Sequence, residues 1–299
     1  MSRAWPRSPS AAATVGLVLV TAVWGSTFIV VKDAVDRMPV MDFLAWRFCL
    51  AALVMAVIRP GAVRRLSPAA RRHGLLLGAA LAAGYVAQTF GLTRTPATVS
   101  GFITGLFVVF TPLCAGLLLR RPVSGPAWAA VALATVGLGL LSLHGLTVGT
   151  GEAITLLCAV SFALHIVGLG EWSTATDAYG LAVLQLVTVG VVSALAAAPE
   201  TLRPPPDGGV WFAILLTALA ATALAFLVQT WAQAHLPPTR AAVIMTMEPV
   251  FAGVFGVAVG GDRLSPRTVA GALLVLAAMY LVELGPRHGA DAAVERLEV

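Results

Sequence analysis

Long apolar runs recur along the whole of this 299-residue chain, and they restrict its fold more than any other feature. Each run is about 20 residues long, which is the length an α-helix needs to cross the roughly 30 Å hydrocarbon core of a bilayer. Hydrophobic residues make up 59% of the chain and charged residues only 11%, whereas soluble domains are about 45–50% apolar and about 25% charged. The sequence therefore predicts a membrane protein.

We expect these runs to be helices. Lipid-facing strands of a barrel would alternate apolar and polar residues, which these runs do not, and a helix satisfies its own backbone hydrogen bonds in lipid. The expected fold is an all-α integral membrane protein with ten transmembrane helices and no soluble domain. The predicted spans cover residues 11–31, 40–58, 74–93, 97–118, 127–144, 152–170, 179–197, 210–233, 240–259 and 268–284.

Basic side chains predict the orientation of the chain in the membrane. An even number of spans places both termini on one side, and cationic residues are retained preferentially in the cytoplasm. With both termini cytoplasmic, twelve Lys and Arg residues lie inside and six outside, while Arg47 falls within a span. These residues stand beside the spans without interleaved aromatic residues, which argues against a nucleic-acid partner.

The chain repeats itself at a shift of about 141 residues. The stretch YVAQTFGLTRTPATVSGFI from Tyr85 aligns with FLVQTWAQAHLPPTRAAVI from Phe226, so that Gln88 matches Gln229. Five helices in each half would invert the second half relative to the first, an architecture that is typical of secondary transporters. We expect two inverted five-helix repeats, residues 1–146 and 147–285, followed by a polar cytoplasmic tail, residues 286–299.

Four stretches of the sequence resemble one family. WGSTFIVVK at 24–32, AWRF at 45–48, SGFITGLFVVFTPL at 100–113 and MEPVFAGVFG at 247–256 are similar to the EamA-type members of the drug/metabolite transporter superfamily. Within that superfamily the chain resembles the YddG-like exporters of aromatic and other amino acids. The resemblance implies ten helices, cytoplasmic termini, a central cavity lined by both halves, and a place in the inner (plasma) membrane of a bacterial-type cell.

Polar and aromatic residues three or four positions apart mark helix faces that are turned away from lipid. Gln88 and Gln229 would lie on opposite walls of a cavity, where they either bind the substrate or hold helices together by hydrogen bonds. Trp24 offers either a flat wall of that cavity or ordinary packing. The side chains that we expect to contact a substrate are Trp24, Phe28, Tyr85, Gln88, Phe162, His165, Phe226 and Gln229.

Ionisable residues deep in the spans are expected to face a partner or water, because a charge there costs a few kcal/mol on insertion scales. Arg47 either anchors helix packing through backbone carbonyls or binds a substrate carboxylate. Glu248 is either a proton carrier or a member of a buried salt bridge or hydrogen bond. His165 either couples transport to protons or is a satisfied buried histidine. Pro112 and Pro249 are candidates for coupling or gating together with Arg47 and Glu248, because proline opens a helix.

Other functional classes fit the sequence poorly. An ATP-driven pump needs a phosphate-binding loop that contains lysine, and the one lysine, Lys32, follows no glycine-rich loop. The H-E-x-x-H and G-x-S-x-G patterns do not occur and the three cysteines lack metal-binding spacing, so no enzymatic activity, cofactor or metal is expected.

The expected function is that of a secondary transporter, acting as a monomer in the lipid bilayer, which exports hydrophobic or aromatic amino acids and related small metabolites by alternating access. The alternatives are a carrier of another small metabolite or drug, and a membrane channel.

Overall fold

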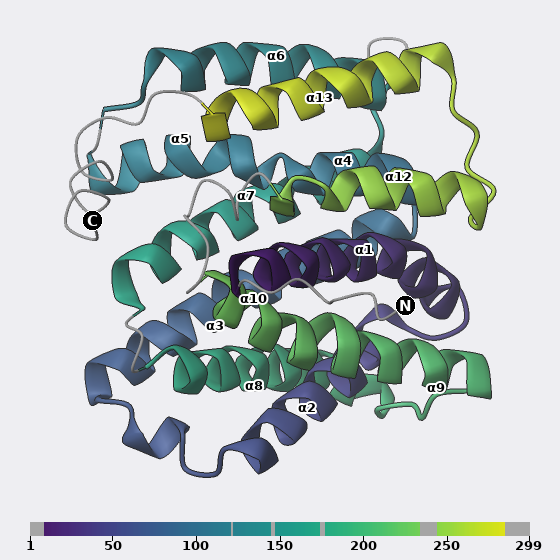
Figure 1. Ribbon diagram of the computed structural model, residues 1–299. Coiled ribbons are helices and arrows are strands. Elements are labelled where there is room, and N and C mark those ends of the chain that lie inside the picture. The colour runs from purple at the N-terminus through teal and green to yellow at the C-terminus, as the bar shows by residue number, and fades with distance from the viewer. Residues whose placement is uncertain (1–8, 121, 145–146, 174–176, 234–243, 285–299) are drawn as a thin grey trace, which may run out of the picture.

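The computed structural model describes residues 9–120, 122–144, 147–173, 177–233 and 244–284. Most of these residues are helical, and the helices run roughly parallel and antiparallel to one another in a single bundle (Figure 1). The predicted tail, residues 286–299, and residues 240–243 of the predicted ninth span lie outside the described residues.

The first half of the chain contains the helices up to residue 142. Pro39 and Pro96 stand at the N-caps of α2 and α4, and the Ser67 side chain accepts a hydrogen bond from the backbone N–H of Ala70 at 3.1 Å to begin α3. The helices are α1 (Pro9–Val35), α2 (Val40–Ile58), α3 (Pro68–Leu92), α4 (Ala97–Gly105), α5 (Phe107–Leu119) and α6 (Gly125–Ser142), with a 3-10 turn at Val63–Arg65.

Two short strands connect the halves. β1 (Leu143–His144) pairs antiparallel with β2 (Thr147–Val148), so α6 ends at Ser142 and the expectation of helix up to residue 144 is wrong by two residues. The chain reverses here to begin α7, and pairing of extended residues satisfies backbone groups that a helix end would leave free. The all-α prediction therefore needs this small correction.

The second half continues with helices that include one stretch of unusual geometry. The Asp207 side chain accepts a hydrogen bond from the backbone N–H of Val210 at 3.0 Å and so caps α9. The elements are α7 (Thr150–Trp172), α8 (Ala178–Ala197), a 3-10 turn at Ala198–Glu200, α9 (Gly208–Leu215), a π-helix (Leu216–Leu224), α10 (Ala225–Gln233), α12 (Glu248–Ala258) and α13 (Pro266–Leu284).

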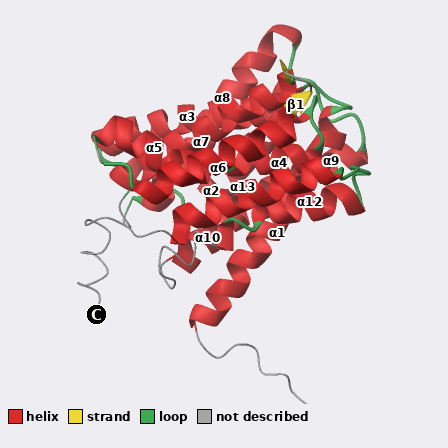
Figure 2. Ribbon diagram, turned by 90° about the horizontal axis from the view of Figure 1, so that it is seen from above, coloured by secondary structure: helices red, strands yellow, loops and turns green. Residues whose placement is uncertain are grey.

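Helices from opposite halves of the chain lie next to each other throughout the bundle. α6 packs along α13 at one edge and α2 along α8 at the opposite edge (Figure 1). Between these edges α3 packs on α7, and α1 and α4 both pack on α12. The view from above shows the short strands together at one end of the bundle (Figure 2). The folded unit is thus built from both halves rather than from two separate domains.

Seven helical stretches in the described chain are long and apolar enough to cross a membrane. They coincide with the predicted spans one to four and six to eight, counting α4 with α5 and α9 with the helices that follow it. Three shorter apolar helices, Gly125–Leu141, Glu248–Ala258 and Pro266–Val282, lie at the predicted spans five, nine and ten. The protein is therefore a helical multi-pass membrane protein, and the count of ten spans stays a prediction.

Glycines allow the central helices to approach closely. A Cβ atom at Gly25 of α1 would lie 2.5 Å from the Phe251 Cβ and 2.7 Å from the Ala252 backbone nitrogen, both in α12. At the edge of the bundle, Gly137 and Gly271 face each other across α6 and α13, each with the other's carbonyl oxygen 2.9 Å from a Cβ position. Small residues are the usual means of helix association in lipid, because apolar burial gives little driving force there.

Candidate functional site

The helices in the middle of the bundle are interrupted in three places. α4 ends at Gly105 and α5 begins at Phe107, the chain turns at residues 246–247 before α12, and Leu216–Leu224 forms a π-helix. Irregular backbone at membrane depth is tolerated where it is buried in protein or lines a cavity, and π-helices are frequent at functional sites. The three interruptions therefore indicate where to look for a site.

Arg47 of α2 lies at the centre of a cluster that joins the halves. Its side chain is only 4% exposed, and its guanidinium carbon lies 5.0 Å from the centres of the Phe48 and Tyr85 rings. Its Nη2 and Nε donate to the hydroxyl of Thr222 in the π-helix at 3.3 and 3.4 Å. A lone arginine at a helix centre costs about 2.5–3.5 kcal/mol on insertion scales, so these contacts offset part of a real penalty.

Tyr85 connects Arg47 to the other half of the bundle. Its ring lies 4.6 Å from the ring of Phe48 and 5.3 Å, edge to face, from the ring of Phe162 in α7. Phe162 fits against Gly84, where a Cβ atom would be only 2.3 Å from the Phe162 ring. Tyr85 and Phe162 are both partly exposed, so the structure brings these two predicted substrate contacts together as an aromatic wall.

The two predicted glutamines each contact a helix of their own half. Gln88 Nε2 donates to the Thr104 hydroxyl of α4 at 3.4 Å, and Gln229 Nε2 lies 3.4 Å from the Met245 sulfur. Both glutamines are partly exposed. Thr104, whose hydroxyl accepts from Gln88, was not singled out by the sequence.

Trp24 is held by the π-helix. The backbone N–H of Ala225 bonds to Ala220 and Thr222 instead of the Ala221 carbonyl, and the Trp24 indole Nε1 donates to that carbonyl at 2.7 Å. Trp24 remains partly exposed. This exposure is compatible with a residue that anchors a helix and also faces a site. The neighbouring Ser26 and Thr27 donate to carbonyls of their own helix at 2.7 Å.

Two predicted contact residues are fully enclosed by protein. Phe28 is 5% exposed and packs in the core formed mainly by α1, α2, α3 and α8. His165 is 7% exposed, and its Nε2 lies 2.5 Å from Oε1 of Gln185 in α8. Since an amide oxygen only accepts, the ring nitrogen carries the proton in this hydrogen bond. This arrangement is that of a satisfied buried histidine.

Glu248 begins α12 and lies in the same central region. The residue as a whole is partly exposed.

The two predicted prolines lie in regular helices. Pro249, which follows Glu248, is buried in the first turn of α12, so this proline begins a helix rather than kinking one. Pro112 lies inside α5, which continues through it, and the interruption of the predicted fourth span is at Leu106. Phe226 lies on α10 and is partly exposed.

The end of the bundle that carries the β-hairpin is tied together by capping contacts that the sequence interpretation missed. Lys32 Nζ donates to the carbonyls of Leu92 and Thr95 at 2.8 and 3.0 Å, at the C-terminal end of α3. The Thr98 backbone N–H donates to the Asp262 carboxylate at 2.8 Å, across the halves. Helix ends leave such groups unpaired. The sequence held no local signal for these contacts, because Lys32 is 60 positions from Leu92 and Asp262 is 164 positions from Thr98.

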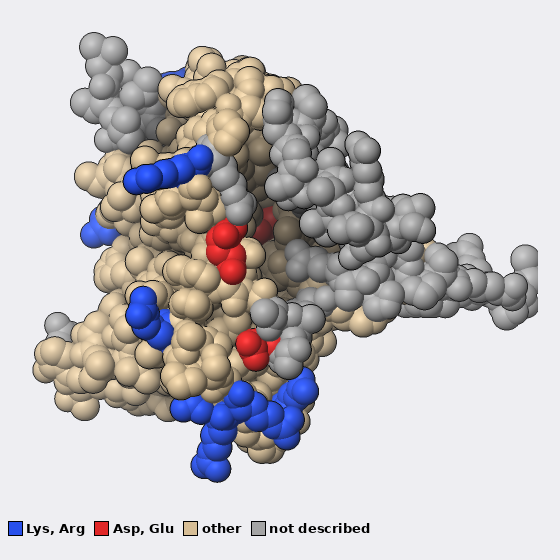
Figure 3. All heavy atoms as spheres, turned by 90° about the vertical axis from the view of Figure 1, so that its left-hand side faces the viewer, with Lys and Arg blue, Asp and Glu red and all other residues tan. Residues whose placement is uncertain are grey.

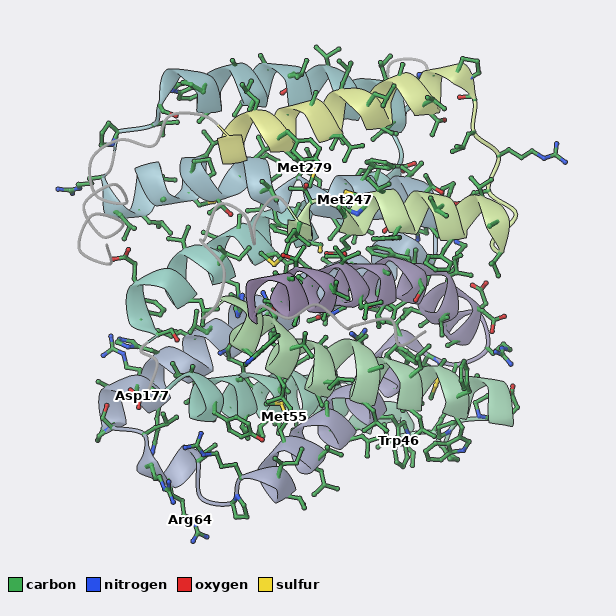
Figure 4. All side chains as sticks on the ribbon, in the orientation of Figure 1. Trp46, Met55, Arg64, Asp177, Met247 and Met279 are labelled. Carbon is green, nitrogen blue, oxygen red and sulfur yellow. The ribbon has the colours of Figure 1, made fainter. Side chains whose placement is uncertain are left out.

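The opposite end of the bundle is basic. Arg64 projects away from the protein between α2 and α3 (Figure 4), and Arg65, Arg71 and Arg72 nearby are exposed as well. Lys and Arg side chains gather along the lower edge of this face (Figure 3).

Comparison with known proteins decides the family. The model of the EamA-like transporter family matches residues 12–143 and, separately, residues 149–284. The chain belongs to this family. EamA-like proteins are transporters, so the chain is a multi-pass membrane transporter, and the coarse part of the sequence-based expectation is confirmed.

Relatives of similar length agree with this assignment. An uncharacterized transporter of Archaeoglobus fulgidus is 35% identical over 277 residues, covering 91% of this chain and 86% of the relative. The uncharacterized inner membrane transporter YedA of Escherichia coli is 25% identical over 273 residues, 88% of each chain. A solved crystal structure aligns with a TM-score of 0.63 at 17% identity, over 97% of this chain and 99% of the other, which shows a shared fold alone.

Proposed function

We propose that this EamA-like protein is a secondary transporter that carries hydrophobic or aromatic amino acids and related small metabolites by alternating access between its two halves. The observation that carries the proposal is the cluster around Arg47. In it, Arg47 and Tyr85 of the first half meet Thr222 and Phe162 of the second half, at the interrupted helices. A solute bound there would touch both halves, which is what alternating access requires.

Two observations support the inverted repeat on which this mechanism depends. The family model matches each half separately. The contact of Gln88 with Thr104 and the contact of Gln229 with Met245 each join residues 16 apart in sequence. Both members of the second pair follow those of the first at the repeat shift of about 141 residues.

The distribution of charge supports an orientation with the Arg64 end in the cytoplasm, because basic residues are retained on that side. Lys32 and Asp262 tie the opposite end of the bundle together. We therefore propose an inner-membrane protein with cytoplasmic termini, seen here with its outer end closed.

The chemistry of the cluster favours a small amphipathic solute. Tyr85 and Phe162 offer aromatic faces, and Gln88 offers amide groups. Arg47 is the one arginine or lysine in this cluster of described residues, which is too little positive charge for a strongly phosphorylated solute. Export as the working direction rests on the resemblance to YddG-like exporters.

The test is uptake by proteoliposomes that contain the purified protein. Labelled tryptophan, phenylalanine, methionine and threonine would be supplied with and without an imposed pH gradient, and empty liposomes would serve as the control. We expect saturable uptake of the apolar amino acids. Transport of another metabolite, with no uptake of any amino acid, would keep the carrier and contradict the substrate class.

A further inference from the structure

Arg47 has fewer partners than its chemistry requires. A guanidinium carries five N–H donors in a fixed plane. The hydrogen bonds of Arg47 run from Nε and Nη2 to a single oxygen, the Thr222 hydroxyl, at 3.4 and 3.3 Å. Those distances lie beyond the usual range for such bonds, and Nη1 donates to no acceptor within the part of the chain that the structure describes.

No carboxylate in the described residues neutralises this cation. The ion pairs found there are those of Arg37 with Asp33 and Asp207, near one end of the bundle. Glu248 forms no ion pair with Arg47. Charged groups inside a membrane protein are normally paired or face water, so an unpaired arginine 4% exposed is a sign of a missing partner.

The surroundings of Arg47 fix its guanidinium for a planar ligand. The rings of Phe48 and Tyr85 each lie 5.0 Å from its central carbon, and Thr222 holds one edge from the π-helix. The two rings and Thr222 thus contact the guanidinium through its faces and through the edge formed by Nε and Nη2. Its Nη1 is left to donate to another acceptor. A carboxylate matches this geometry, because its two oxygens accept two parallel N–H bonds from one arginine.

We propose that Arg47 is the subsite that binds the carboxylate of the transported solute, with Thr222 and the ring of Tyr85 as its positioning residues. The inference rests on the proposed function and narrows it: the solute carries a free carboxylate. The apolar part of that solute then lies against Tyr85 and Phe162, whose rings meet at 5.3 Å. Because Thr222 belongs to the second half, binding of the carboxylate also couples the halves.

The experiment compares two solutes in proteoliposomes, phenylalanine and phenylalaninol, in which an alcohol replaces the carboxylate. The wild-type protein should prefer phenylalanine. Arg47→Gln should lose that preference, with phenylalanine uptake lowered at least about tenfold and phenylalaninol uptake nearly unchanged, because a hydrogen bond to a charged group is lost. Arg59→Gln, at the C-cap of the same helix beside Tyr179, is the matched control and should behave as wild type.

Two results would overturn the subsite. One is equal uptake of both solutes by the wild-type protein, which leaves the carrier function intact. The other is an Arg47→Gln protein that keeps the wild-type preference for phenylalanine. If that variant does not yield monodisperse protein, Arg47→Lys takes its place. It keeps the charge but lacks the planar fork, so phenylalanine uptake should fall several-fold, and unchanged uptake would count against the subsite.

A binding measurement separates this inference from the amino-acid function. The purified protein would be heated with and without hydrocinnamate, a carboxylate without an amino group. Stabilisation of the wild type that is lost in Arg47→Gln would support the subsite even if no amino acid is transported. Equal stabilisation of both proteins would contradict it.

Discussion

Gln88 and Gln229 occupy equivalent places in the two halves but meet different chemistry. Each reaches a residue 16 positions further along the chain, which is the Thr104 hydroxyl for Gln88 and the Met245 thioether for Gln229. At the position that Tyr85 occupies in the first half, the second half carries Phe226. The contact of the glutamine with a residue 16 positions on is therefore repeated in both halves. The polar hydroxyls of Thr104 and Tyr85 are not repeated, because the second half carries Met245 and Phe226 in their places.

This difference teaches that the scaffold and the site follow different rules. Helix packing requires small residues and matching lengths, which both halves supply, so α6 meets α13 and α2 meets α8 as partners. Recognition of an amphipathic solute requires a polar end and an apolar end. The first half supplies the polar groups of Tyr85 and Thr104, and the second half supplies the apolar side chains of Phe226 and Met245.

The largest expected effect comes from breaking the scaffold that both halves share. In Gly25→Ala the new Cβ would lie 2.5 Å from the Phe251 Cβ and 2.7 Å from a backbone nitrogen that cannot move aside. Overpacking of this kind costs about 1–3 kcal/mol or more. Gly253→Ala is the control, since its nearest neighbour would be 3.4 Å away. Thermal unfolding in detergent would measure both, and equal stability of the two variants would contradict the close approach.

The next effect separates the two glutamines. Gln88→Ala should lower amino-acid uptake about tenfold, as expected for a lost hydrogen bond near the solute, while Gln229→Ala should lower it about threefold or less. The reason is that Gln88 donates to the Thr104 hydroxyl, whereas Gln229 faces a thioether. Uptake kinetics at matched protein density would measure the difference. Equal losses would mean that the halves are also equivalent in function.

A smaller effect on uptake is expected when Tyr85 is replaced by the phenylalanine that stands at the equivalent position of the second half. Tyr85→Phe keeps the ring that Arg47 covers and removes only the hydroxyl, so uptake should fall by no more than about threefold. Phe226→Tyr, the reciprocal change, should leave uptake near the wild-type value. A loss of tenfold or more in Tyr85→Phe would instead place the hydroxyl in direct contact with the solute.

The smallest effect concerns the ion pair that joins the halves outside the site. The backbone N–H of Val210 and the charge of Arg37 hold the pKa of Asp207 below its usual value. Stability from this group is therefore complete above the unfolded pKa of about 3.9 and is lost as the pH falls through the lower folded pKa. Asp207→Asn should lower the melting temperature slightly at pH 7, and the difference from wild type should shrink toward pH 3. A difference that stays constant over this range would contradict the assignment.

The apolar runs predicted the helices well because length and hydrophobicity decide insertion locally. The second predicted span and α2 share the bounds 40–58, for example. The interruptions were not predictable, because a π-helix such as Leu216–Leu224 depends on side chains from other helices, here the Trp24 indole that takes the Ala221 carbonyl.

The site was predictable only in part. The helical spacing of polar and aromatic residues pointed to Tyr85 and Gln88, but their partners lie far away in sequence. Thr222, the residue that contacts Arg47, is 175 positions from it. The partner of His165, Gln185 on the next helix, was not predicted either, and a role of His165 in proton coupling stays a prediction.

The most direct test of the central claim, that the two halves form a carrier with the solute bound between them, is counterflow. Liposomes that contain the protein would be loaded with unlabelled phenylalanine and diluted into a trace of labelled phenylalanine. A carrier exchanges the two across the membrane, so the label should rise transiently above its equilibrium level and then fall. Entry of the label at a rate independent of the internal phenylalanine, with no transient accumulation, would indicate a channel and contradict the account.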